Sequence, residues 1–268
     1  MLELSNSDNM LYVHENNIIN KINKNYGGKK QQLEEFYKNK YLPMRDKLNG
    51  IKFTGDNEDT FKNATKIIND YRADLSKFAR DNKISSQSKF ESTFLEEISV
   101  YLFKDVPEIK RGEFGIFNKG IYAGLKIDNN KNIDFITKDF DFCIGKKANI
   151  YVDNGEPKEI ILPIVAVEVK TYLDATMFGE VKSSSKSIRS ASPNSKAYVL
   201  MGYKSMDDEH IVASRQDATL TEMFCLQENE NDEIHWNVIY DYWLEITNAI
   251  KELSNPNTVN KVGKLLNN

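Results

Sequence analysis

The chain has 268 residues, of which 40% are hydrophobic and 28% are charged, and its formal net charge at pH 7 is −4. These values are typical of a globular protein with one large domain or two small ones. They exclude a protein that coats nucleic acid through bulk positive charge, although a nuclease can combine an acidic centre with local basic patches. The sequence contains no run of about 18 apolar residues that could span a membrane.

The N-terminal segment, MLELSNSDNM, is acidic and lacks the charged-then-apolar pattern of a signal peptide, so a cytoplasmic location is expected. Cys143 and Cys225 lie in apolar segments and predict no disulfide framework. The three histidines are scattered and show no zinc-binding spacing.

Helical spacing of apolar residues dominates the first part of the chain. It predicts helices over 11–22, ending at Gly27-Gly28, over 33–41, stopping near Pro43, and over about 60–79. A fourth helix is predicted from Ser88, as N-cap, to about residue 103. We expect residues 1–84 to form a helical region, 85–254 to form the core, and 255–268 to form a polar tail.

Glu91 lies three residues after Ser88 and, on a helical wheel, within the apolar arc of the fourth helix. Glu96 points to the far side of that wheel and Glu97 to an edge. Glu91 is therefore either the capping-box partner of Ser88 or a buried carboxylate directed at a catalytic centre, with Glu97 as the other candidate on the helix.

Beyond residue 107 the apolar period changes to that of strands, which predicts a mixed α/β fold. Residues 114–117 and 121–127 read as a hairpin, 133–145 as a strand with Asp139 and Asp141 on one face, and 149–152 and 159–170 as strands around a turn. The remaining predictions are a helix over 174–189, strands over 196–203 and 223–226, and a closing helix over 238–253.

The run Pro163-Ile-Val-Ala-Val-Glu-Val-Lys170 is typical of a strand that is buried on both faces. Residues two apart on a strand share a face, so Glu168 and Lys170 point the same way. An ion pair at the end of a buried strand is costly unless it is satisfied. It is therefore either a structural pair or part of a metal site.

Asp141 is predicted to end an apolar strand one hairpin before Glu168. Two carboxylates on neighbouring strand ends, with a nearby backbone carbonyl such as that of Val169, suit Mg²⁺. Such an ion can polarise a phosphoryl oxygen and acidify a water, while Lys170 orients that water. Asp139, on the same face, stays open as an alternative ligand.

Asp141, Glu168, Val169 and Lys170 match the signature of the PD-(D/E)XK nuclease superfamily, with Phe140 in place of the usual proline. The longer block Glu168–Met177, followed by a helix and Lys196-Ala-Tyr-Val-Leu200, resembles type II restriction endonucleases of the BbvCI and DdeI kind. The resemblance implies a central mixed sheet flanked by helices and Mg²⁺-dependent double-strand cleavage of DNA. It also implies a homodimer or a heterodimer with a related subunit, and it supports Glu91 as a helix glutamate of the site.

Lys182, Lys186 and Arg189 form a basic stripe opposite the apolar face of the predicted helix 174–189. We expect this stripe to bind DNA phosphates, with Lys146 and Lys147 as weaker candidates. The helical region over residues 1–84 is expected to serve DNA recognition or dimerisation. Two alternatives remain, namely a repair or structure-specific nuclease on the same core and a non-catalytic DNA-binding module.

Overall fold

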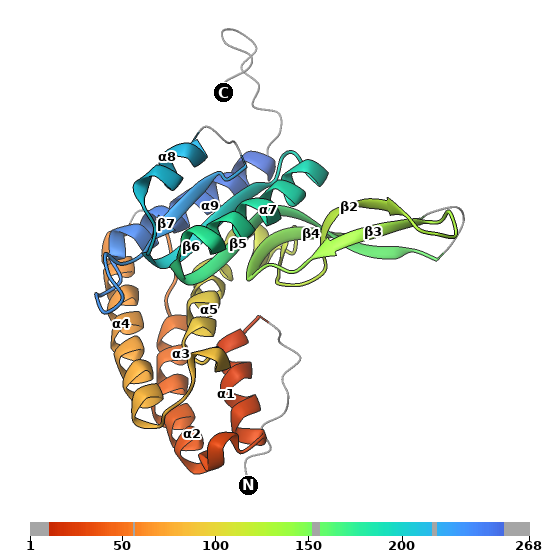
Figure 1. Cartoon of the computed structure of the whole chain (residues 1–268). Helices are drawn as coiled ribbons and strands as arrows, with labels where there is room; N and C mark the ends of the chain where they lie inside the picture. The colour runs from red at the N-terminus through yellow and green to blue at the C-terminus, as the bar shows by residue number, and fades with distance from the viewer. Residues whose placement is uncertain (1–10, 56, 152–155, 216–218, 255–268) are drawn as a thin grey trace.

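The computed structural model describes residues 11–55, 57–151, 156–215 and 219–254. A bundle of N-terminal helices packs below a seven-stranded mixed sheet, and two long ribbons of that sheet project sideways from the body (Figure 1). Of the helices within these ranges, none combines the length and apolar character that a membrane span requires.

The N-terminal bundle consists of α1 (Val13–Asn23), α2 (Lys30–Phe36), α3 (Leu42–Asn49) and α4 (Glu58–Asp81). The predicted stop near Pro43 is wrong, because Pro43 occupies the first turn of α3, where its missing N–H costs nothing. A π-helical turn, Tyr37–Tyr41, joins α2 to α3 and keeps the chain helical up to the proline. The helix predicted over 60–79 is confirmed as the longer α4.

The fourth predicted helix begins later than expected. Residues Ser86–Ser88 form a short 3₁₀ turn, and α5 runs from Ser92 to Phe103 with Glu91 at its N-cap position. Ser88 is therefore not the N-cap of this helix. Helix α5 lies between the bundle and the sheet, and its apolar side chains belong to one buried cluster that contains residues of both.

Seven strands form the sheet in the order β1-β4-β5-β2-β3. Strand β6 pairs with the same edge of β5 as β2, further along the strand, and β7 lies next to β6. Their bounds are β1 (Gly115–Phe117), β2 (Ile121–Ile127), β3 (Ile133–Lys138), β4 (Phe142–Ile150), β5 (Lys158–Leu173), β6 (Lys196–Lys204) and β7 (Glu222–Cys225). Strand β5 pairs antiparallel with β4 and parallel with β6, so the Glu168-bearing strand is central, as its apolar run predicts.

Two strand predictions are wrong. β1 and β2 do not form a hairpin, because β1 pairs with β4 while β2 pairs with β3 over its whole length. The predicted strand 133–145 is two strands, and Asp139, Phe140 and Asp141 form the break between β3 and β4. The predicted turn at 153–157 falls largely outside the described residues.

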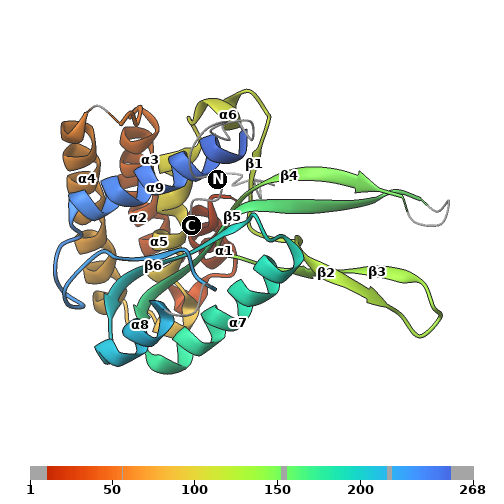
Figure 2. The same cartoon turned by 90° about the horizontal axis from the view of Figure 1, so that it is seen from above.

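Helices cover both faces of the sheet (Figure 2). Helix α7 (Ala175–Ala191) packs on β2, β5 and β6, whereas α5 and α9 (Trp236–Ser254) pack on the opposite face. Asp174 caps α7 by accepting a hydrogen bond from the Met177 N–H at 2.8 Å. Two shorter helices were not predicted, α6 (Pro107–Lys110) and α8 (Asp208–Arg215).

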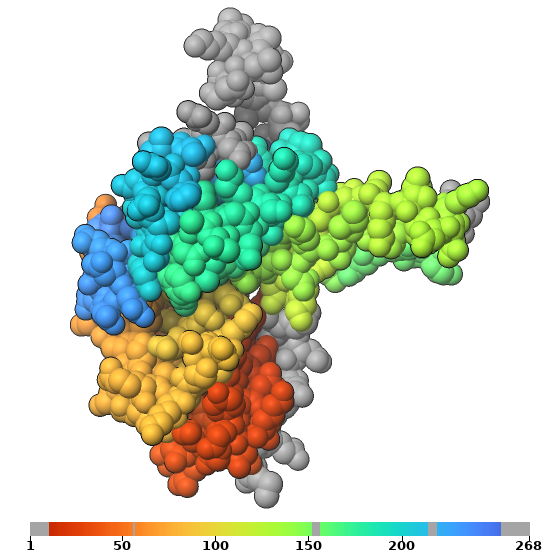
Figure 3. All heavy atoms as spheres, viewed as in Figure 1, coloured from red at the N-terminus to blue at the C-terminus, as the bar shows by residue number. Residues whose placement is uncertain are grey.

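The ribbons of β2–β3 and β4–β5 stand out from the rounded body in the space-filling view (Figure 3). The two ribbons are joined by an ion pair between Lys158 of β5 and Asp134 of β3, which are 3.2 Å apart. Leu125 and Ile127 on β2 are 57% and 75% exposed, so the ribbon carries apolar side chains away from the core.

Candidate active site

Three of the four predicted catalytic side chains meet at one point on β5. The Lys170 Nζ lies 3.0 Å from Glu168 Oε2 and 3.7 Å from Asp141 Oδ2. The ammonium group of Lys170 therefore pairs with both carboxylates. The side chains are partly buried, with 13% of Glu168, 26% of Asp141 and 27% of Lys170 exposed, which leaves the cluster open to a substrate.

The register of β4 and β5 explains how Asp141 reaches Glu168. Phe142, the first residue of β4, pairs with Val167, so Asp141 stands one position further along, beside Glu168. Asp141 thus precedes a strand, whereas the sequence predicted that it ends one. Its Oδ2 accepts a hydrogen bond from the Val169 N–H at 2.7 Å, at an edge of β5 where the β4 ladder has stopped. The carbonyl of Val169 points to the same edge of the strand as its N–H.

Asp139 takes a different role. Its Oδ1 accepts a hydrogen bond from the Gly120 N–H at 3.1 Å, and its side chain is exposed. Gly120 has a φ of 70°, a left-handed conformation that favours glycine, so Asp139 holds the turn before β2. The geometry therefore favours Asp141 over Asp139 as the carboxylate of the site.

Burial and charge act together on the cluster. Burial raises the pKa of Glu168, and Asp141 raises it further, while Lys170 opposes both. Burial lowers the pKa of Lys170, but Asp141 and Glu168 outweigh that effect and the pKa is raised overall. Lys170 is thus held as an ammonium, and the carboxylates lie in a place where a second cation would relieve their repulsion.

Glu96 on α5 is a fourth member that the sequence analysis did not select. Burial raises its pKa to about 7, with Asp141 and Glu168 adding to the shift and Lys89 and Lys170 opposing it. The electrostatic influence of Asp141, Glu168 and Lys170 on this carboxyl group indicates that Glu96 lies near the cluster.

Glu91 lies elsewhere. Its side chain is exposed and accepts a hydrogen bond from Ser76 Oγ of α4 at 2.6 Å. The predicted burial of Glu91 is therefore wrong, and so is the capping box, since the Glu91 side chain makes no cap hydrogen bond. The helical wheel does not apply to Glu91 because α5 begins one residue later, at Ser92.

Glu97 is fully buried, and its carboxylate accepts hydrogen bonds from the N-terminal bundle. Its Oε2 accepts hydrogen bonds from the N–H groups of His14 and Glu15 at 2.8 and 3.0 Å, in the first turn of α1. Its Oε1 accepts from the hydroxyls of Tyr41 and Tyr101 at 2.8 and 2.6 Å. This carboxylate supplies the acceptor that α1 lacks at its own N-terminus.

Replacing Glu97 by alanine is expected to lower the free energy of unfolding by about 3 kcal/mol or more, because four buried donors lose their acceptor. Urea unfolding followed by circular dichroism measures the change. Glu91→Ala, at the N-cap position of the same helix, is the matched control and should cost less than about 1 kcal/mol, as it loses one exposed hydrogen bond. Equal stability of the two variants would contradict the capping role.

The basic residues predicted to bind DNA lie on two separate elements. Lys182 and Arg189 are half-buried on α7 and Lys186 is exposed, while Val181 and Ile188 pack inward as predicted. Lys146 and Lys147 lie exposed on β4, and Lys147 pairs with Glu159 of β5 at 2.9 Å. Lys138, at the end of β3, is a further cation near the site, because its charge lowers the pKa of Glu168.

Across the described ranges, no group of three or more Asp, Glu, His or Cys side chains stands ready to hold a metal ion. Two carboxylates around one ammonium nevertheless fit a small divalent cation, since hard oxygen ligands and uncompensated negative charge are what Mg²⁺ requires. Asp141 and Glu168, with the Val169 carbonyl, are the ligands that this arrangement supports.

Comparison with known families gives a match over residues 87–224 to the model described as Bpu10I restriction endonuclease. This match covers α5, all the strands up to β7 and the whole cluster. The chain belongs to the Bpu10I restriction endonuclease family. It is accordingly a site-specific nuclease of the restriction type, as the sequence resemblance implied.

The fold is also similar to a solved structure titled "native BbvCI A2B2 tetramer at low resolution". The two chains superpose with a TM-score of 0.73 at 14% sequence identity, and the alignment covers 94% of this chain and 99% of that one. The shared fold therefore includes the N-terminal helices and extends well beyond the family match. A search of curated proteins gave no significant match.

Proposed function

We propose that this chain cuts both strands of DNA at a short specific sequence in a Mg²⁺-dependent reaction. The observation that carries the proposal is the cluster of Asp141, Glu168 and Lys170 at the centre of a restriction-endonuclease fold. The family assignment favours this function over a repair nuclease, and the retained carboxylates and lysine disfavour a non-catalytic module.

Each side chain of the cluster has a task in that reaction. Asp141 and Glu168 would hold the metal ion, which when bound polarises a phosphoryl oxygen and lowers the pKa of a water. Lys170 keeps its proton between the two carboxylates, so its N–H groups can orient an attacking water and offset charge that develops on the phosphate. Glu96, in place of Glu91, is the helix carboxylate that can accept a hydrogen bond from a metal-bound water.

Double-strand cleavage requires two such centres, and each chain supplies one cluster. The structurally similar BbvCI is described as an A2B2 tetramer. We therefore propose that this chain acts as a homodimer or together with a related subunit, on double-stranded DNA and in the cytoplasm.

Incubation of plasmid DNA with the protein and Mg²⁺, followed by sequencing of the fragment ends, tests the proposal. Discrete fragments with one shared end sequence are expected, and EDTA should prevent their formation. Intact plasmid under all divalent-ion conditions, or cuts confined to branched or mismatched substrates, would refute it. If only one strand is cut, the related subunit is required.

The basic stripe on α7 is expected to contact phosphates and not bases. Lys186→Gln should weaken binding to cognate and unrelated duplexes about equally and reduce the salt slope by about one unit. Fluorescence anisotropy between 50 and 200 mM salt measures both quantities. Lys66→Gln, an exposed lysine on α4, is the control, and a loss of discrimination at one base pair would make α7 a base reader.

A further inference from the structure

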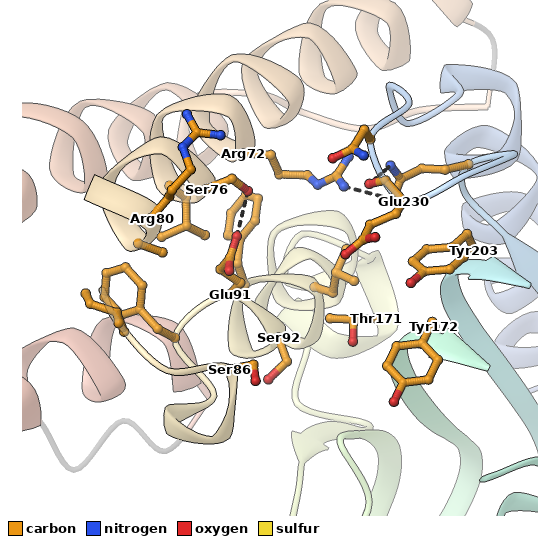
Figure 4. Close-up of a pocket in the computed structure, with 18 of the residues that line it drawn as sticks. Arg72, Ser76, Arg80, Ser86, Glu91, Ser92, Thr171, Tyr172, Tyr203 and Glu230 are labelled. Carbon is orange, nitrogen blue, oxygen red and sulfur yellow. Dashed lines mark hydrogen bonds between the residues drawn. The ribbon is translucent and has the colours of Figure 1, made fainter. Parts of the chain in front are cut away.

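A cavity of about 470 Å³ opens next to the cluster of Asp141, Glu168 and Lys170. Neither these three side chains nor Glu96 lines it. It lies where β5 and β6 end, between α4, the start of α5 and the loop that follows β7 (Figure 4). Its volume is within the range of small-ligand sites. Thr171 and Tyr172, the two residues that follow Lys170, form part of its wall.

The strand geometry fixes the distance between cavity and cluster. Lys170 and Tyr172 are two residues apart on β5, which places their Cα atoms about 7 Å from each other along the strand. Successive phosphates of a DNA strand have a similar spacing. A strand whose scissile phosphate lies at Lys170 would therefore bring a neighbouring nucleotide to the mouth of this cavity.

One wall is aromatic. The rings of Tyr172 and Tyr203 stack with centroids 5.9 Å apart and planes at 27°, and Tyr172 is 36% exposed. Figure 4 shows both rings on the side of the cavity opposite Arg72 and Ser76. An exposed tyrosine that is already stacked offers a flat, rigid surface, and a nucleobase stacks favourably on such a surface.

The opposite wall is polar and carries positively and negatively charged side chains. Arg72 donates to the Gln227 amide oxygen at 2.8 Å and to the Asp232 carbonyl, both neutral acceptors, so other donors of its guanidinium remain for a ligand. The carboxylates of Glu91 and Glu230 face the same space. Carboxylates disfavour a phosphate here, whereas an arginine beside carboxylates suits the mixed donors and acceptors of a base edge.

We propose that this cavity binds one unstacked nucleobase of the cleaved DNA strand, stacked on Tyr172 and hydrogen-bonded by Arg72 and Glu230. The proposal deepens the proposed function, since the base would be held out of the duplex beside the scissile phosphate. Its amino group would face Glu230, which favours a base that carries one.

Photocrosslinking to single-stranded DNA tests this inference without requiring cleavage. An oligonucleotide that contains 5-iododeoxycytidine is bound to the full-length protein, irradiated and digested, and the attached peptide is identified by mass spectrometry. We expect attachment at Tyr172 or Tyr203. Tyr172→Leu should reduce the yield about tenfold, the size expected for the loss of one stack, while Tyr172→Phe should retain it. Tyr151→Leu, at an exposed tyrosine on the ribbon side, should not change it.

A second measurement uses the cognate duplex once the fragment ends have given the site. With Ca²⁺ in place of Mg²⁺, 2-aminopurine at one position beside the scissile phosphate should brighten several-fold on binding, and Tyr172→Leu should abolish the increase. Crosslinks confined to other residues, or cleavage without brightening at any position, would overturn the inference. Crosslinking at Tyr172 without any cleavage would refute the proposed function alone.

Discussion

Glu168→Ala is expected to abolish DNA cleavage while DNA binding remains measurable. Glu168 is the least exposed member of the cluster and shares the Lys170 ammonium with Asp141, so its loss removes a metal ligand and the partner of the lysine. Metal-assisted catalysis supplies several kcal/mol, and each 1.36 kcal/mol is a factor of ten in rate, so a loss of about 10³-fold or more is expected. Single-turnover cleavage of a duplex that contains the site measures the rate.

Asp141→Asn gives a matched second variant. The asparagine oxygen can still accept the hydrogen bond from the Val169 N–H, so the strand end keeps its geometry while one negative charge is lost. The cleavage rate should fall as far as in Glu168→Ala. Asp139→Asn is the control and should retain activity, because Asp139 binds the Gly120 turn. Unchanged cleavage by the Glu168 variant would contradict the whole assignment.

Glu96→Gln is expected to slow cleavage strongly and, at the same time, to stabilise the metal-free protein above pH 7. In the folded state burial and the neighbouring carboxylates raise the pKa of Glu96 to about 7, from an ordinary 4.5. The unfolded chain therefore releases the Glu96 proton first. The resulting cost to stability begins near pH 4.5, grows as the pH rises and is complete above about 7.

Glutamine removes this cost. The shift corresponds to about 3 kcal/mol before solvent screening, so about 1–2 kcal/mol of added stability is expected at pH 8 and almost none at pH 4.5. Urea unfolding at the two pH values measures the difference. A residue with a merely structural role would lose stability on substitution, whereas a carboxylate held for function gains it.

Glu91→Gln is the matched control for that experiment, since it lies on the same segment of chain and bears the same charge. It should cut DNA at a rate much closer to wild type than Glu96→Gln. The reverse order of cleavage rates would restore Glu91 as the helix carboxylate that the sequence predicted.

The sequence predicted the central part of this fold because the signals there are local and strong. The apolar run before Glu168 is typical of a buried strand, and Asp174 with the helical period after it defined α7 to within two residues. Strand β6 and helix α9 were predicted on the same grounds. The three side chains that meet at the candidate site, Asp141, Glu168 and Lys170, were likewise selected from strand periodicity and a short motif.

Long-range pairing explains most of the errors. The segment before Gly120 looked like half of a hairpin, but β1 joins β4 instead, at a distance in sequence that no local pattern encodes. The three glutamates of α5 were sorted by a helical wheel that measures only the direction of the apolar core. Glu97 faces another helix, Glu96 faces the polar site and Glu91 precedes the helix, and only tertiary structure separates them.

The central claim is that Asp141 and Glu168 bind one divalent ion, and Mn²⁺ titration followed by electron paramagnetic resonance tests it most directly. Free Mn²⁺ gives a sharp signal that is lost on binding, so the number of ions bound per chain can be counted without any cleavage. At saturating DNA, wild type and Glu91→Gln are expected to bind one more ion per chain than Glu168→Ala and Asp141→Asn. Equal numbers of ions bound by all four proteins would contradict the claim.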